Sequence, residues 1–84
     1  MAKIYVDVWT PGNGKIYEFQ LDNVMTVGKV KAKMIEEIIE IEFGNIKLDR
    51  EKVLLCNLST QMQLNEAQTL HSAGVKSGQR LLLV

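Results

Sequence analysis

The chain has 84 residues, 46% of them hydrophobic and 24% charged, a composition that fits one small globular domain and excludes a disordered segment. Ten acidic side chains balance ten basic ones, so no net charge draws the chain to nucleic acid or to an anionic membrane. A single cysteine excludes an internal disulfide and a cysteine-rich zinc site, and no uninterrupted apolar run approaches the ~20 residues of a membrane-spanning helix.

Two alternating segments at the start of the chain predict an antiparallel hairpin. Apolar and polar side chains alternate over residues 3–10 and again over 16–21, which is the period of a strand with one buried face. The four residues from Pro11 to Gly14 combine proline, glycine and asparagine, a concentration typical of a turn. The side chains expected to face the core are Ile4, Val6, Val8, Tyr17, Phe19 and Leu21.

The segment Thr26–Gly44 predicts one long amphipathic helix, because its apolar residues recur at spacings of three and four. Thr26 can accept a hydrogen bond from a free amide of the first turn. Gly44 suits the left-handed residue that commonly follows a helix end. The apolar face expected to lie on a sheet consists of Val27, Val30, Met34, Ile35, Ile38, Ile39, Ile41 and Phe43.

Beyond the helix, the sequence predicts a polar loop followed by three more strands. The loop 45–52 carries Ile46 and Leu48 as expected anchors. The segment Val53–Leu58 predicts a strand, and its continuous apolar residues indicate either burial on both sides or an exposed apolar face. The remaining expected elements are a minor strand within 58–64, a single helical turn at Thr69–Gly74 and a final strand at Gln79–Val84.

This order of elements predicts the α+β class. One helix should cross one face of a mixed five-stranded sheet, with the short helical turn before the last strand and the last strand placed centrally beside the first. We expect a single domain over residues 1–84, without a cofactor or a metal, and a cytoplasmic location.

Charges along the predicted helix run against the helix dipole, since lysines crowd its start and glutamates its end. One interpretation is that packing overrides this cost, with an i,i+4 pair between Lys33 and Glu37. Lys47, Arg50 and Lys52 would then fold back onto the acidic end. The alternative is a bipolar surface that docks a partner of matching polarity.

The order of elements and two local strings resemble ubiquitin. TVGKVKAKM, from Thr26, resembles the start of the ubiquitin helix, and QLNEAQTLHSAGVKSGQRLLLV, from Gln63, resembles its later part. The resemblance covers nearly the whole chain at low identity and implies a ubiquitin-like β-grasp fold. Conjugated family members and sulfur carriers end in a flexible Gly-Gly, whereas this sequence ends at Val84. We therefore expect a protein that is not conjugated, with a C-terminally acting modifier or sulfur carrier as the alternative.

A closer resemblance is to the bacterial YukD/EsaB family of small ubiquitin-like proteins. Members have about this length, end on the last strand and carry a motif like SGQRL at Ser77–Leu81. The family is associated with type VII secretion. The resemblance therefore implies a cytoplasmic accessory protein that works beside the secretion ATPase and the WXG100 substrates.

The sequence gives little support for catalysis, so we expect no enzyme. Cys56 and His71 are the one pair that could supply a nucleophile and a base. Cys56 lies in a predicted strand, where it is ordinary apolar filler, and His71 lies in a surface turn with no third residue to orient it. The loop from Gly12 to Gly14 joins two strands and opens no helix, which favours a hairpin turn over a phosphate site.

The sharper functional hypothesis concerns the sheet face that the helix leaves uncovered. If the alternating apolar residues point at the helix, several other large apolar side chains must point to solvent. Exposed patches of this kind usually mark protein interfaces. We expect a non-catalytic module that binds a protein through this face, without binding nucleic acid or inserting into a membrane; a homodimer through the same face is a further hypothesis. The candidate partner-binding residues are Tyr5, Trp9, Ile16, Leu54, Leu82 and Val84.

Overall fold

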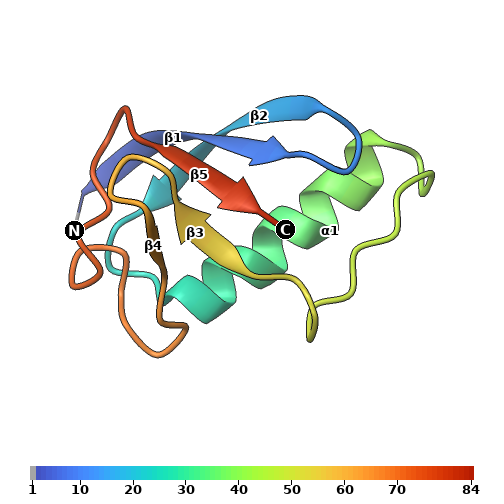
Figure 1. Ribbon diagram of the computed structural model, residues 1–84. Coiled ribbons are helices and arrows are strands. Elements are labelled where there is room, and N and C mark those ends of the chain that lie inside the picture. Colours follow the sequence, from blue (N-terminus) through green and yellow to red (C-terminus); the bar gives the residue numbers. More distant parts are fainter. Residues whose placement is uncertain (1) are drawn as a thin grey trace.

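The computed structural model describes residues 2–84 and consists of one helix lying across one face of a five-stranded sheet (Figure 1). The strands are ordered β2-β1-β5-β3-β4, and only the central pair β1–β5 is parallel. This arrangement confirms the predicted α+β class, the mixed sheet and the central position of the last strand. In chain order the elements are β1 (Lys3–Thr10), β2 (Lys15–Asp22), α1 (Val27–Ile41), β3 (Leu55–Asn57), β4 (Met62–Gln63) and β5 (Arg80–Leu83).

Strands β1 and β2 form the predicted hairpin. Their register runs from Lys3 opposite Asp22 to Thr10 opposite Lys15, so β2 is slightly longer than its sequence pattern indicated. The turn closes with a 3.0 Å hydrogen bond from the Gly14 amide to the Thr10 carbonyl. Gly14 has φ +69°, a left-handed conformation that glycine adopts without strain.

Helix α1 begins as the sequence predicts. Thr26 is the N-cap, and its hydroxyl accepts a hydrogen bond of 3.3 Å from the Lys29 amide. The helix buries one face against the sheet, which contributes most of its stability because isolated helices of this length are marginal in water. Its buried residues are Val27, Val30, Lys31, Met34, Ile35 and Ile38.

Helix α1 ends at Ile41, two residues before the predicted end at Phe43, while Gly44 is left-handed as predicted. Phe43 (φ +53°) and Gly44 (φ +77°) are both left-handed. The Phe43 amide donates to the Glu40 carbonyl and the Gly44 amide to the Ile39 carbonyl, the pair of bonds that reverses a chain at a helix end. This reversal takes Phe43 off the helical face and leaves its side chain 90% exposed. Ile41, in the last turn, projects past the core and is exposed as well, so neither residue belongs to the buried face.

A lysine occupies part of the buried face of α1. Lys31 is only 5% exposed, and its ammonium group donates to the Val53 carbonyl at 3.0 Å and to Glu66 at 3.1 Å. These bonds satisfy a charge that would otherwise be costly to bury. The helix is therefore tied by a polar contact to the segment that enters β3.

Strand β3 is shorter than predicted, with ladder pairing over Leu55–Asn57 only. Its alternation is nevertheless as expected, since Val53 and Leu55 are buried and Leu54 is exposed. Asn57 is fully buried; its amide group donates to Gln79 at 3.0 Å and its carbonyl oxygen accepts from the Ser59 amide at 2.9 Å.

The segment before β5 forms the single turn expected at Thr69–Gly74. The Ala73 amide donates to the Thr69 carbonyl at 2.9 Å, as in one turn of α-helix. Gly74 (φ +78°) ends the turn, and the Val75 amide closes it on the Leu70 carbonyl.

The core lies between α1 and the sheet. Every inward residue predicted for the hairpin is buried, together with Leu81 and Leu83 of β5, and Ile46 and Leu48 pack against this core from the long loop as expected. Within residues 2–84, no helix has both the length and the apolar character required to cross a bilayer.

Candidate partner-binding surface

A row of side chains crosses the sheet face opposite α1. Cα pairing places Ile16 of β2 beside Trp9 of β1, Trp9 beside Leu82 of β5, and Leu82 beside Cys56 of β3. Because residues at one level of neighbouring strands share a face, these four side chains are adjacent. The row ends in the polar Gln63 of β4. We call the four residues Ile16, Trp9, Leu82 and Cys56 the apolar row.

Leu54 and Val84 extend the apolar row at the next level along the strands. They exchange two backbone hydrogen bonds, of 2.6 and 3.0 Å, which fix them opposite each other. We call the apolar row together with Leu54 and Val84 the outer patch. Trp9 is 38% exposed, Ile16 52%, Leu54 41% and Val84 50%, whereas Leu82 and Cys56 are half-buried between their neighbours.

Tyr5 is separated from the other predicted site residues. It lies on the same face of β1 and is 52% exposed, but Asp7 stands between it and Trp9. Four residues of strand span roughly 13 Å, too far for Tyr5 to contact the apolar row. Its backbone is held to the turn before β5, because its amide donates to the Ser77 hydroxyl at 3.0 Å.

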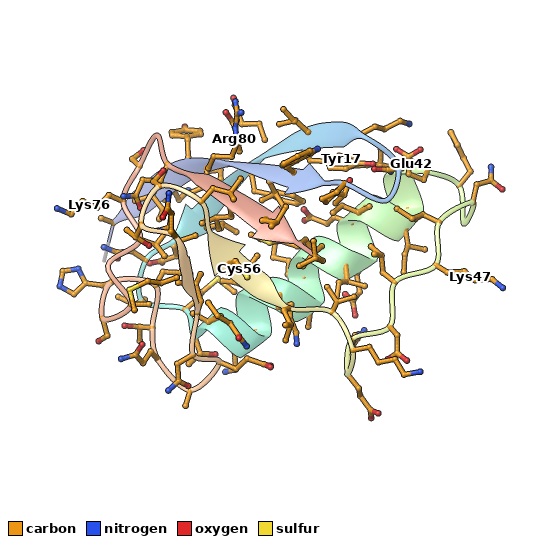
Figure 2. All side chains as sticks on the ribbon, in the orientation of Figure 1. Tyr17, Glu42, Lys47, Cys56, Lys76 and Arg80 are labelled. Atoms are coloured by element: carbon orange, nitrogen blue, oxygen red, sulfur yellow. The ribbon has the colours of Figure 1, made fainter. Side chains whose placement is uncertain are left out.

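A charged level borders the apolar row on the side of Tyr5. Glu18 of β2, Asp7 of β1 and Arg80 of β5 lie side by side on the outer face. Figure 2 shows Arg80 on the side of the sheet away from α1. Among residues 2–84 the ion pairs are Lys15–Glu42, Lys31–Glu66 and Arg50–Glu36, so none of these three side chains makes a direct ion pair within the part of the chain that is described.

A groove of 440 Å³ adjoins the other end of the outer patch. It lies between the hairpin turn, the loop after α1 and the end of β5, and it shares Val84 with the patch. Its lining residues are Thr10, Gly12, Asn13, Asn45, Ile46, Lys47, Leu48, Val53, Leu83 and Val84.

A chain of hydrogen bonds ties the hairpin turn to the end of α1, where Figure 2 labels Tyr17 and Glu42. Thr10 bonds Asn13, whose side-chain amide donates to the Tyr17 hydroxyl at 3.0 Å. Tyr17 and Lys15 donate to the two oxygens of Glu42, at 2.8 and 2.6 Å. The Lys15 bond and then the Tyr17 bond lower the pKa of Glu42, while desolvation and the bond to Glu42 raise the pKa of Tyr17. We call this network the polar bridge.

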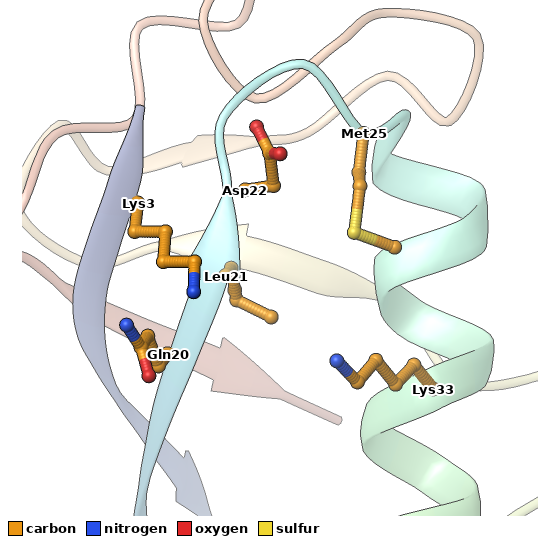
Figure 3. A pocket seen from close by; sticks show the side chains of 6 residues that line it. All are labelled: Lys3, Gln20, Leu21, Asp22, Met25 and Lys33. Carbon is orange, nitrogen blue, oxygen red and sulfur yellow. The ribbon is translucent and has the colours of Figure 1, made fainter. Parts of the chain in front are cut away.

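The polar bridge and one ion pair account for part of the reversed charge pattern of α1. Arg50 folds back onto Glu36 at 2.6 Å as expected, whereas Lys47 and Lys52 form no ion pair within residues 2–84. The predicted pair between Lys33 and Glu37 does not form. Lys33 instead lines a hollow of 250 Å³ between α1 and β2, and Figure 3 shows its ammonium group and that of Lys3 directed toward this hollow.

Cys56 and His71 are not brought together. Cys56 lies in the apolar row, and His71 lies in the exposed turn after Leu70, where its amide donates to the Asn23 carbonyl. No hydrogen bond joins their side chains within the described residues. Over the same residues no three His, Cys, Asp or Glu side chains gather into a group that could hold a metal ion.

Several features of the surface are visible only in three dimensions. The alternation of each strand indicated which side chains face outward, but the place of Cys56 in the apolar row follows from the β3–β5 register. The charged level follows in the same way from the β1–β2 and β1–β5 registers. No local signal in the sequence points to the polar bridge, whose Lys15–Glu42 contact joins residues 27 positions apart.

Comparison with known proteins supports the fold and nothing narrower. No protein-family model and no curated protein matches the chain. The N-terminal ubiquitin-like domain in the 4931431F19Rik protein is 23% identical, with a TM-score of 0.73 over 98% of this chain and 73% of that one. The ubiquitin-like domain of Arabidopsis thaliana At2g32350 is 20% identical (TM-score 0.74, 100% and 78% covered), and Caldiarchaeum subterraneum ubiquitin is 22% identical (0.73, 98% and 91%). The chain therefore has a ubiquitin-like β-grasp fold, a fold that hosts many functions.

Proposed function

We propose that this protein is a non-catalytic module that binds a protein partner through the outer patch. The observation that carries the proposal is the apolar row, in which exposed and half-buried side chains from four different strands lie side by side opposite the helix. A sheet face with only polar side chains would be stable in water, so the fold does not require apolar side chains as exposed as Trp9 and Ile16 on this face.

The patch has the composition of a protein interface. Large apolar side chains lie at its centre and charges lie at its border, as in interfaces with a dry core and a polar rim. Trp9 is the residue type most often found among binding hot spots. The charged level of Glu18, Asp7 and Arg80 supplies a pattern that fixes the orientation of the partner more than its affinity.

For the biological setting, we propose a cytoplasmic accessory component of a type VII secretion system. The support for this narrower statement is the sequence resemblance to the YukD/EsaB family, including the Ser77–Leu81 motif. The partner would then be a component of that apparatus, such as its ATPase. A neighbouring gene for a membrane ATPase or a WXG-containing helical hairpin would support the assignment, and a genome without either would refute it.

The binding test uses purified protein and the soluble domains of those secretion components. Wild-type protein should bind one of them in calorimetric titration. The double variant Leu54→Asp with Leu82→Asp should bind at least about 100-fold more weakly, because two apolar anchors become charges that must be desolvated. Circular dichroism should show that this variant is folded.

Val24→Asp is the matched control, since Val24 is 48% exposed and lies in the loop before α1, outside the outer patch. It introduces one of the two charges of the double variant, in place of one exposed apolar side chain. Binding should equal that of the wild type. Loss of affinity in the control as large as that in the double variant would remove the outer patch from the proposal.

A further inference from the structure

We propose that the outer patch also binds a second copy of this chain, forming a face-to-face dimer of two sheets. This inference rests on the proposed function, since it assigns an occupant to the same surface. It is carried by the arrangement of residues across the central strands, which makes the face complementary to itself.

The central pair of strands determines the geometry. β1 and β5 run parallel, with Trp9 beside Leu82 and Asp7 beside Arg80. Consider a two-fold axis that lies between these strands and runs parallel to them. It places β1 of one copy over β5 of the other, and residues at the same height along the strands then face each other. Trp9 of one copy then faces Leu82 of the other, and the same contact occurs twice.

The neighbouring strands follow the same symmetry. β2 of one copy faces β3 of the other, so Ile16 meets Cys56 of the second copy. The apolar row therefore meets an apolar row over its whole width. Two sheets packed in this way are aligned to within about 30°, the usual angle of a β-sandwich.

The charged level supplies the complementarity. Under this symmetry Asp7 faces Arg80 of the second copy, and each makes no ion pair within its own described chain. Two intermolecular ion pairs then border the apolar contact. The chain carries no net charge, so no overall repulsion opposes association.

A two-fold axis across the strands gives a poorer match. It would place Arg80 of one copy against Val84 of the other, because these residues lie at levels on opposite sides of Leu82. A guanidinium group would then be desolvated against an apolar side chain. The axis along the strands sets only Glu18 against an apolar residue, Leu58, at the margin of the face, and pairs opposite charges at the centre. It is therefore the one that the surface favours.

The interface is small. A tenth of the 5265 Å² molecular surface is on the order of 500 Å² per copy, which is below the standard size for a stable complex. We expect a reversible dimer with a dissociation constant of about 10–100 μM.

Sedimentation equilibrium tests this dimer. The average mass of the wild type should rise from 9.5 kDa toward twice that value between about 1 μM and 1 mM protein. Asp7→Arg alone and Arg80→Asp alone should each remain monomeric, because like charges then meet at both positions. An equimolar mixture of the two variants should regain the mass of a dimer, since opposite charges face each other again across the interface.

Three results would overturn the inference: a wild type that stays at 9.5 kDa throughout, single variants that associate as well as the wild type, or a mixture no heavier than its components. Circular dichroism checks that each variant folds. If one does not, Ile16→Asp is the substitute, because Ile16 lies on edge strand β2 and is 52% exposed. That variant should be monomeric, and normal association would equally refute the dimer.

Cys56 provides a second readout without mutation. Its thiol meets Ile16 of the second copy, so its rate of alkylation by iodoacetamide should fall as protein concentration rises. An unchanged rate would contradict the dimer. If the wild type stays monomeric while the Leu54→Asp, Leu82→Asp variant still loses its secretion partner, the dimer is wrong and the proposed function stands. If the dimer forms but that variant binds the partner normally, the proposed hetero-complex is wrong instead.

Discussion

The reversal that closes α1 places the same backbone demand on two neighbouring residues that differ in how well they meet it. Phe43 has φ +53° and Gly44 has φ +77°, so both are left-handed although only one is glycine. The left-handed region costs an L-residue roughly 1–2 kcal/mol. The Phe43 side chain is 90% exposed, so it recovers little of this cost by burial.

Replacing Phe43 with glycine should therefore stabilise the protein. The conformational cost disappears, but the unfolded chain gains freedom that offsets about 0.5–1 kcal/mol of it. We expect Phe43→Gly to raise the free energy of unfolding by about 0.5–1 kcal/mol. Gly44→Ala should lower it by about 1 kcal/mol, because that change introduces the same cost.

Urea unfolding followed by circular dichroism measures both changes. The urea concentration at the unfolding midpoint should rise for Phe43→Gly and fall for Gly44→Ala, while the slope of unfolding free energy against urea stays unchanged. The melting temperature of Phe43→Gly should rise by about 2–8 °C. Phe43→Ala is the control, because it removes the ring but keeps the β-carbon. If Phe43→Gly is no more stable than Phe43→Ala, the left-handed backbone at this position does not destabilise the wild type.

Three further predictions concern the core, the polar bridge and the last strand. Lys31→Ala should lower the free energy of unfolding by about 2–4 kcal/mol, because it leaves a cavity and an unpaired Val53 carbonyl. Lys31→Met fills the cavity and should lower it less. Equal losses of the two variants in urea unfolding would contradict this. The Lys15 bond, followed by the Tyr17 bond, lowers the pKa of Glu42. The contribution of the Glu42 carboxylate to folding stability is therefore fully present above the usual pKa of 4.5 and is lost as pH falls through the lowered pKa. Thermal melts at decreasing pH should show a shallower acid decline for Glu42→Gln, and parallel declines would argue against the bridge. Leu82→Asp should remain folded by circular dichroism and Leu81→Asp should not, because Leu81 is fully buried.

The hairpin and the inward face of the sheet could be read from the sequence because alternation is a local signal. The start of α1 could be read for the same reason, since Thr26 and the apolar spacing both lie within a few residues of it. The end could not. The sequence pattern favoured continuation through Ile41 and Phe43, whereas the left-handed pair at residues 43 and 44 ended the helix first.

Lys31 shows why a buried polar side chain is hard to predict from the sequence. It stands on the buried arc of α1, one position after Val30, but a lysine there reads as solvent-exposed. Its partner Glu66 lies 35 residues away, so nothing nearby in the sequence indicates the contact. The outer patch was predictable only as separate residues. Its continuity depends on how β1 pairs with β5. The separation of Tyr5 from it follows from the four-residue distance to Trp9 along β1.

The pairing of β1 with β5 also links recognition to completion of folding. The hydrogen bond between Tyr5 and Ser77 joins residues 72 positions apart, and closing such a distance is slow because chain entropy is lost before contacts compensate for it. Trp9 and Leu82 become neighbours only after that closure. A chain still emerging from the ribosome would therefore present no assembled binding face. Partners that use this face would select finished molecules over unfinished ones.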